Sequence, residues 1–143
     1  MVVIGDYRGQ CPSTEPNLHF LGLKPQASLP AYLANSSVAI IPWKVNKITR
    51  ATSPLKLYEY LAMNVPVVVP DLPPLYDIPY VFLSKSTAEF LENIRAAMGA
   101  TVDPELLQAY VRAHSWEHRV GQLVGLPGFL NQDRSGFQAQ PKD

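Results

Sequence analysis

The order of apolar and polar positions predicts short buried strands that alternate with amphipathic helices. The predicted strands are short runs rich in apolar residues: 2–6, 17–22, 38–42, 66–70 and 80–83. Of these, 38–42 and 66–70 are wholly apolar, as is typical of strands covered on both faces. The predicted helices repeat apolar residues at helical spacing: residues 29–34, 54–63, 86–98, 104–111 and a last helix from Ser115 to Leu123 or Leu126. Residues 38–70 form a predicted strand, helix and strand, which is a βαβ unit, so we predict an α/β fold with a Rossmann-like parallel sheet flanked by helices.

The clearest of these units is the helix that begins near Ser53, together with the strand after it. We expect Ser53 to supply an N-cap oxygen and Pro54 to occupy the first helical position. Leu57 and Leu61 lie one turn apart and can face a sheet, and Asn64 can end the helix in the left-handed conformation. With the strand before it, this is a βαβ unit, and its loop lies where parallel sheets bind ligands.

Two polar residues on this helix are candidate ligand contacts. Lys56 falls in the first turn, where the helix dipole disfavours a cation by up to about 1 kcal/mol unless an anion binds there. Glu59 follows one turn later and could accept hydrogen bonds from sugar hydroxyls. The alternative, which the spacing alone favours, is an exposed surface pair worth ~0.2–0.5 kcal/mol.

Composition bounds the class of protein. The 143 residues are 47% hydrophobic and 17% charged with no net charge, which fits a soluble globular domain and gives no global sign of nucleic-acid binding. No apolar run is long enough for a membrane span, and the lone Cys11 cannot form an internal disulfide, which agrees with a cytosolic setting. Between Pro16 and Tyr58 there are five basic residues and no acidic one. An anionic ligand and a solvated basic surface explain this block equally well.

The sequence offers no catalytic group and no metal site. His19 alternates with apolar neighbours and fits a half-buried strand position, and no nucleophile turn accompanies the histidines. His114 and His118 are four residues apart, but Ser115 between them is expected to break the helix. There is no phosphate-binding glycine motif.

Several short segments follow one another in a particular order, and together they resemble a known family. They are Val3-Ile4-Gly5-Asp6, Asn17-Leu18-His19-Phe20-Leu21-Gly22, Leu29-Pro30-Ala31-Tyr32-Leu33, Val38-Ala39-Ile40-Ile41-Pro42, Ser53-Pro54-Leu55-Lys56-Leu57-Tyr58-Glu59-Tyr60-Leu61-Ala62, Pro66-Val67-Val68 and His114-Ser115-Trp116. The set resembles the C-terminal, donor-binding lobe of GT-B glycosyltransferases of the family-4 (group 1) type, and most of all those that build bacterial envelope polysaccharides. The resemblance implies half of a GT-B fold over residues 1–126. Residues 127–143 are polar and show no periodicity, so we predict a disordered tail there.

The resemblance also implies a set of donor-binding residues. Glu59 matches the second glutamate of the family's Glu-x7-Glu motif, which binds the ribose, whereas Ala51 stands where the first would contact the sugar. The segment that would offer backbone N–H groups to the diphosphate is Thr52, Ser53, Pro54, Leu55 and Lys56, and the loop that would border the base is Gly22, Leu23 and Lys24. The implied substrate is a UDP- or GDP-sugar, with no cofactor and no metal.

The implied activity belongs to a longer protein. The lobe's first βα unit and the acceptor-binding lobe are expected outside these residues, in cis or in trans, so this chain alone is expected to be inactive. The full-length enzyme would transfer a hexosyl unit to an envelope polysaccharide or a lipid-linked glycan. It would work in the cytoplasm, at the inner face of the membrane by peripheral association. The alternatives are a stand-alone nucleotide-binding subunit with a separate acceptor-lobe chain, and a relative of the sugar-nucleotide 2-epimerases.

Overall fold

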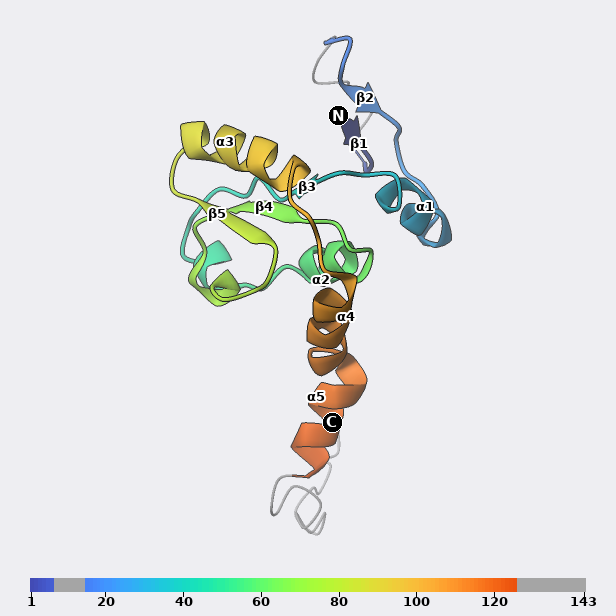
Figure 1. Cartoon of the computed structure of the whole chain (residues 1–143), viewed down its shortest axis with the longest axis vertical. Coiled ribbons are helices and arrows are strands. Elements are labelled where there is room, and N and C mark those ends of the chain that lie inside the picture. Colours follow the sequence, from blue (N-terminus) through green and yellow to red (C-terminus); the bar gives the residue numbers. More distant parts are fainter. Residues whose placement is uncertain (7–14, 126–143) are drawn as a thin grey trace, which may run out of the picture.

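The computed structural model describes residues 1–6 and 15–125, which form an α/β arrangement with parallel strands (Figure 1). The strands are β1 (Val2–Val3), β2 (His19–Phe20), β3 (Ala39–Ile40), β4 (Val67–Pro70) and β5 (Val81–Ser84). The helices are α1 (Leu29–Leu33), α2 (Leu55–Ala62), α3 (Thr87–Met98), α4 (Pro104–Ala113) and α5 (Trp116–Val124). Short 3₁₀ helices are η1 (Gln26–Ser28), η2 (Thr49–Ala51) and η3 (Pro73–Leu75). The predicted tail 127–143, the possible helix end at Leu126 and Cys11 lie outside the described residues.

The centre of the molecule is a three-stranded parallel sheet in the order β3-β4-β5. In the central strand, the side chains of Val67, Val68 and Val69 are fully buried, because α3 packs against β4 and β5 on one face and α2 packs against β4 on the other (Figure 1). The all-apolar pattern of this segment therefore correctly predicted a strand covered on both sides.

The stop after α2 has the geometry of a Schellman motif. Asn64 adopts a left-handed φ of 58°, the N–H of Val65 donates to the Tyr60 carbonyl at 3.0 Å, and the N–H of Asn64 donates to the Leu61 carbonyl at 2.9 Å. Val65 is buried at 2% exposure, which supplies the apolar contact that accompanies this motif. The predicted role of Asn64 is confirmed.

Three helices in the described part of the chain begin with a side-chain cap. Ser86 accepts from the N–H of Glu89 at 3.2 Å, Asp103 accepts from the first N–H groups of α4, and Ser115 accepts from the N–H of His118 at 3.2 Å. Ser28, which precedes α1, carries no such cap. Its hydroxyl donates to the Pro25 carbonyl at 2.7 Å and does not cap α1.

The N-terminal strands differ from the prediction of one sheet. β1 and β2 pair in parallel with each other, Val2 opposite His19 and Val3 opposite Phe20, and form a separate two-stranded sheet. In Figure 1 this pair and α1 stand to one side of the β3-β4-β5 body. None of the residues in β1, β2 or α1 is buried, whereas the buried apolar residues run from Ile41 to Leu107.

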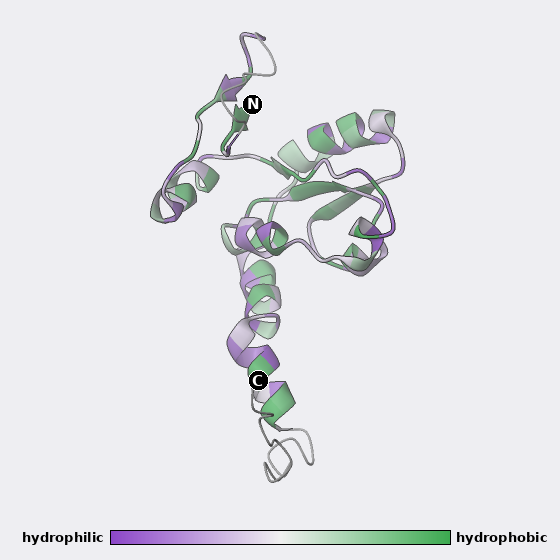
Figure 2. Ribbon diagram, turned by 180° about the vertical axis from the view of Figure 1, so that it is seen from behind, coloured by the Kyte–Doolittle hydropathy of each residue, from purple (hydrophilic) through white to green (hydrophobic). Residues whose placement is uncertain are grey.

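The last two helices extend from the body as an arm (Figure 1). α4 packs on α2 through its buried Leu107, and α5 follows α4 with no buried residue of its own. Apolar side chains on α5 are about half exposed, with Val120 at 51% and Leu123 at 49%, and Figure 2 shows this helix as a mixture of apolar and polar surface.

Candidate functional site

The first turn of α2 lies after the loop that leaves the sheet at the end of β3. The structure corrects the predicted start by one residue, because Pro54 is the N-cap, Leu55 is the first helical residue and no side chain caps the helix. Ser53 is exposed, and its Oγ lies 3.5 Å from the Tyr58 hydroxyl instead. Pro54 is extended, at φ −71° and ψ 125°, and its ring is buried, so the chain reaches its helical conformation only at the next residue.

The two faces of α2 divide as the sequence predicted. Leu57 and Leu61 are fully buried against the core, whereas Leu55, Lys56 and Glu59 are exposed. Lys56 and Glu59 form no ion pair with each other, and both are exposed as either interpretation requires. With the corrected start, Lys56 is the second helical residue. The N–H groups of Leu55 and Lys56 have no acceptor in an earlier turn, whereas the N–H of Leu57 donates to the Pro54 carbonyl at 3.1 Å.

The basic loop before α2 is held by its own side chains. Asn46 Oδ1 accepts from the N–H groups of Ile48 at 2.9 Å and Thr49 at 3.0 Å, and the Thr49 hydroxyl donates to the Lys44 carbonyl at 2.9 Å. Half-buried Thr52 donates to the Ile48 carbonyl at 2.7 Å. These local bonds order the path that delivers the chain to α2.

Tyr58 lies at a contact between α2, α4 and α5 that the sequence did not predict. Arg119 Nη2 donates to the Tyr58 hydroxyl at 3.3 Å, and its guanidinium carbon lies 5.6 Å from the centre of the Tyr58 ring. His114 stacks between two tyrosines, with ring centres 6.1 Å from Tyr58 and 4.1 Å from Tyr110. These partners are far from Tyr58 in sequence, so only the fold could reveal the cluster.

Burial raises the pKa of Tyr110 above its ordinary value of 10.0. Nearby Tyr58 raises this pKa further, whereas the positive charge of Arg119 lowers it. The side chains of Tyr58, Tyr110 and Arg119 therefore interact electrostatically at the junction of α2, α4 and α5.

The residues predicted to border the base lie in the N-terminal unit. Gly22 has a left-handed φ of 69°, and its carbonyl accepts from the N–H of Gly5 at 3.1 Å. Leu23 is 75% exposed and Lys24 is half-buried. Within the described ranges no hydrogen bond joins residues 22–24 to residues 52–59. Hydrogen bonds therefore do not connect the two parts of the predicted site.

A second polar group follows the central strand. Asp71 comes directly after β4, and its Oδ1 accepts from the Tyr76 hydroxyl at 2.8 Å. This hydrogen bond is the main reason that the pKa of Tyr76 is raised, and nearby Arg50 opposes the rise. Arg50 belongs to η2, which contacts η3 just before Tyr76, so this group ties the basic loop to the end of β4.

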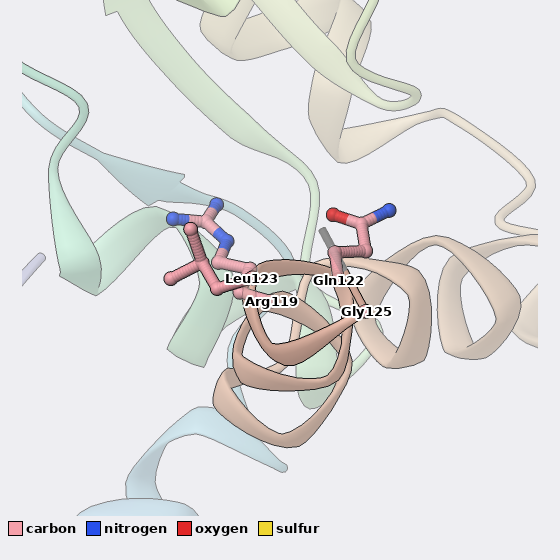
Figure 3. Close-up of a pocket in the computed structure, with 4 residues that line it drawn as sticks. All are labelled: Arg119, Gln122, Leu123 and Gly125. Carbon is pink, nitrogen blue, oxygen red and sulfur yellow. The ribbon is translucent and has the colours of Figure 1, made fainter. Parts of the chain in front are cut away.

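A surface hollow of about 740 Å³ is lined by α5, through Arg119, Gln122, Leu123 and Gly125 (Figure 3). Figure 3 shows Arg119 and Leu123 on one side of the helix and Gln122 on the other. α5 and the Gly125 that caps it supply all four residues, so the hollow is a shallow surface feature. Among residues 1–6 and 15–125, no cluster of three or more metal-ligating side chains occurs and no helix could cross a membrane.

The fold and the exposed face of α2 define a class of α/β protein whose ligands bind at the carboxyl ends of parallel strands. The sequence adds a relationship to glycosyltransferases. The chain is 35% identical over 121 residues to TuaH of Bacillus subtilis (strain 168), which is named provisionally as a teichuronic acid biosynthesis glycosyltransferase. This match covers 79% of the chain but only 30% of TuaH. No protein-family model matches the chain, and no solved structure matches it.

Proposed function

We propose that this chain is the donor-binding part of a glycosyltransferase and that its ligand is a UDP- or GDP-sugar. The observation that carries the proposal is the exposure of Lys56 and Glu59 on the first two turns of α2, directly after a βα loop. The similarity to TuaH supports the reaction class, and the name of that protein places it in teichuronic acid biosynthesis. For the full enzyme we propose an envelope polysaccharide or a lipid-linked glycan as the acceptor of a hexosyl unit.

The chemistry of these residues suits a nucleotide sugar. The N–H groups at the start of α2 and the Lys56 ammonium can together face a diphosphate, and the dipole penalty on Lys56 then becomes an attraction. Glu59 is exposed on α2, so its carboxylate can accept hydrogen bonds from the ribose hydroxyls. Gly22, Leu23 and Lys24 are proposed to border the base.

The remaining parts of the activity are proposed to lie in other residues. Transfer needs an acceptor site, and the chain spans less than a third of the relative that it matches. We assign no catalytic residue to this chain, and the acceptor-binding lobe would be supplied in cis or in trans. The full enzyme would act in the cytoplasm, with peripheral association at the inner face of the membrane.

The first experiment tests Glu59 by calorimetric titration of the chain with UDP and GDP. Glu59→Gln should weaken the nucleotide that binds by about 1–3 kcal/mol, because a charged hydrogen bond to ribose becomes a weaker neutral one. Glu92→Gln is the matched control, because Glu92 is also an exposed helical glutamate but lies on α3. An affinity that is the same in wild type and Glu59→Gln would return Glu59 to an ordinary surface position.

A further inference from the structure

Arg119 is a cation held in a fixed place by an aromatic ring. α5 has no buried residue, yet the Arg119 guanidinium reaches α2, where it donates to the Tyr58 hydroxyl at 3.3 Å and stands 5.6 Å from the ring centre. A cation over an aromatic face is stabilised electrostatically, and the planar guanidinium loses little further entropy when it binds a ligand. The side chain is therefore preorganised.

Hydroxyl groups converge on the same place from two other elements. Ser53 Oγ, just before α2, lies 3.5 Å from the Tyr58 hydroxyl. Tyr110 of α4 is near enough to both Tyr58 and Arg119 for each to shift its pKa, in opposite directions. The Arg119 guanidinium of α5 and the hydroxyl groups of Ser53, Tyr58 and Tyr110 thus lie close to one another, near the start of α2.

Most of the hydrogen-bonding capacity of Arg119 is unused. A guanidinium carries five N–H donors, and Tyr58 accepts one of them. Within residues 1–6 and 15–125, no carboxylate lies within 4.0 Å of Arg119 to neutralise it. Arg119 also borders the open hollow along α5, on the side of the helix that it shares with Leu123 (Figure 3). The unused N–H donors of Arg119 are positively charged and border open space, so an anion can bind to them.

We propose that Arg119 is a phosphate-binding residue: its guanidinium, held on Tyr58, and the Ser53 hydroxyl bind oxygens of the nucleotide's diphosphate and extend the donor site from α2 to α5. This inference rests on the proposed function, since it names a second cation for the same ligand. Arginine suits the task because its planar fork matches two phosphate oxygens at once.

The test is calorimetric titration of the 143-residue chain with UDP and with inorganic pyrophosphate, which carries the phosphates without the base and ribose. Arg119→Gln should lower the affinity for both ligands by about tenfold or more, the usual effect of losing a charged hydrogen bond. The affinities of Arg119→Lys should lie between those of wild type and Arg119→Gln, because lysine keeps the positive charge but loses the planar fork of N–H donors. Arg112→Gln, a change of an exposed arginine in the last turn of α4, is the control and should leave both affinities unchanged.

The outcomes separate this inference from the proposed function. If Glu59→Gln weakens UDP while Arg119→Gln does not, the role of Arg119 is overturned and the donor site stands. If pyrophosphate binds in an Arg119-dependent manner and neither UDP nor GDP binds more tightly than pyrophosphate, the anion site stands and the nucleotide proposal fails. If neither ligand binds the wild-type chain, both are overturned.

A structural role for Arg119 gives a different pattern. It would lower the melting temperature of Arg119→Gln and leave the affinities of the folded protein at their wild-type values, which would overturn the proposal. Tyr58→Phe provides the second variant, because it keeps Arg119 and the ring but removes the hydroxyl that orients the guanidinium. It should weaken pyrophosphate less than Arg119→Gln does.

Discussion

Tyr60 connects the exposed site to the core. Its side chain packs against the hydrophobic core from α2, and it follows Glu59 in the sequence. Burial raises the pKa of Tyr60 above its ordinary value of 10.0, and the negative charge of Glu59 raises it further. Both effects disfavour the tyrosinate, so the folded protein holds this proton more tightly than the unfolded chain does.

This raised pKa predicts a loss of stability at alkaline pH. The contribution of Tyr60 is fully present below pH 10 and is lost as the pH rises from 10 towards the higher folded pKa, because the unfolded chain then releases a proton that the folded protein retains. Urea unfolding between pH 8 and pH 11 should therefore show a steeper decline in the free energy of unfolding for wild type than for Tyr60→Phe.

The same urea-unfolding measurement on Glu59→Gln tests the second cause of the raised pKa of Tyr60. The substitution removes the smaller cause and leaves burial in place, so its decline should be intermediate between those of wild type and Tyr60→Phe. Identical declines for wild type and Tyr60→Phe would show that Tyr60 does not govern this part of the pH dependence.

At the scale of single residues, the sequence predicted buried positions better than polar contacts. Leu57, Leu61 and Asn64 were placed correctly because helical spacing and the left-handed preference of asparagine are local properties. The cap at Ser53 was wrong, because the structure makes Pro54 the N-cap and turns the serine hydroxyl towards Tyr58. Arg119 could not be predicted at all, since its partner lies on another helix.

Among the elements, one side chain joins α4 to the end of α2. Gln108 Nε2 donates to the Ala62 carbonyl at 2.8 Å and lies 3.5 Å from Asn64 Oδ1. Ala62 is the last residue of α2, and the chain turns away from the helix at Asn64, so no later turn offers an N–H to the Ala62 carbonyl. Gln108 therefore satisfies a carbonyl that the helix itself cannot.

Gln108→Leu should destabilise the protein by about 1–3 kcal/mol, because the half-buried Ala62 carbonyl loses its donor. Urea unfolding measures the change. Gln122→Leu provides the control, since Gln122 is exposed on α5 and should change the free energy of unfolding by less than about 0.5 kcal/mol. Equal effects of the two substitutions would mean that the contact between α4 and α2 contributes little.

The existence of most elements followed from the sequence, whereas their pairing did not. Apolar runs and capping residues predicted β3 to β5 and α2 to α5 to within a few residues. The same pattern at β1 and β2 gave no indication that these strands would pair only with each other, because an apolar run identifies a strand and not its neighbour. Pairing depends on contacts that are distant in sequence.

At the scale of the whole molecule, burial is concentrated in one region. The buried cluster joins α2, β4, η3 and α4, and its fully buried members include Leu61, Val67 and Leu107. β1, β2 and α5 contribute no buried residue. Since local stability follows apolar burial, the molecule should open first at β1, β2 and α5, and last in the β3-β4-β5 sheet.

Native-state hydrogen exchange with Leu61→Ala tests this division. Truncation of the fully buried Leu61 should cost roughly 2–5 kcal/mol and lower the opening free energies of β4 and β5 amides by that amount. Amides of β1 and β2, which exchange by local opening, should keep their wild-type rates. Leu123→Ala on the half-exposed face of α5 is the control and should leave the sheet amides unchanged. A uniform loss of protection in Leu61→Ala would instead require the N-terminal strands to unfold with the core.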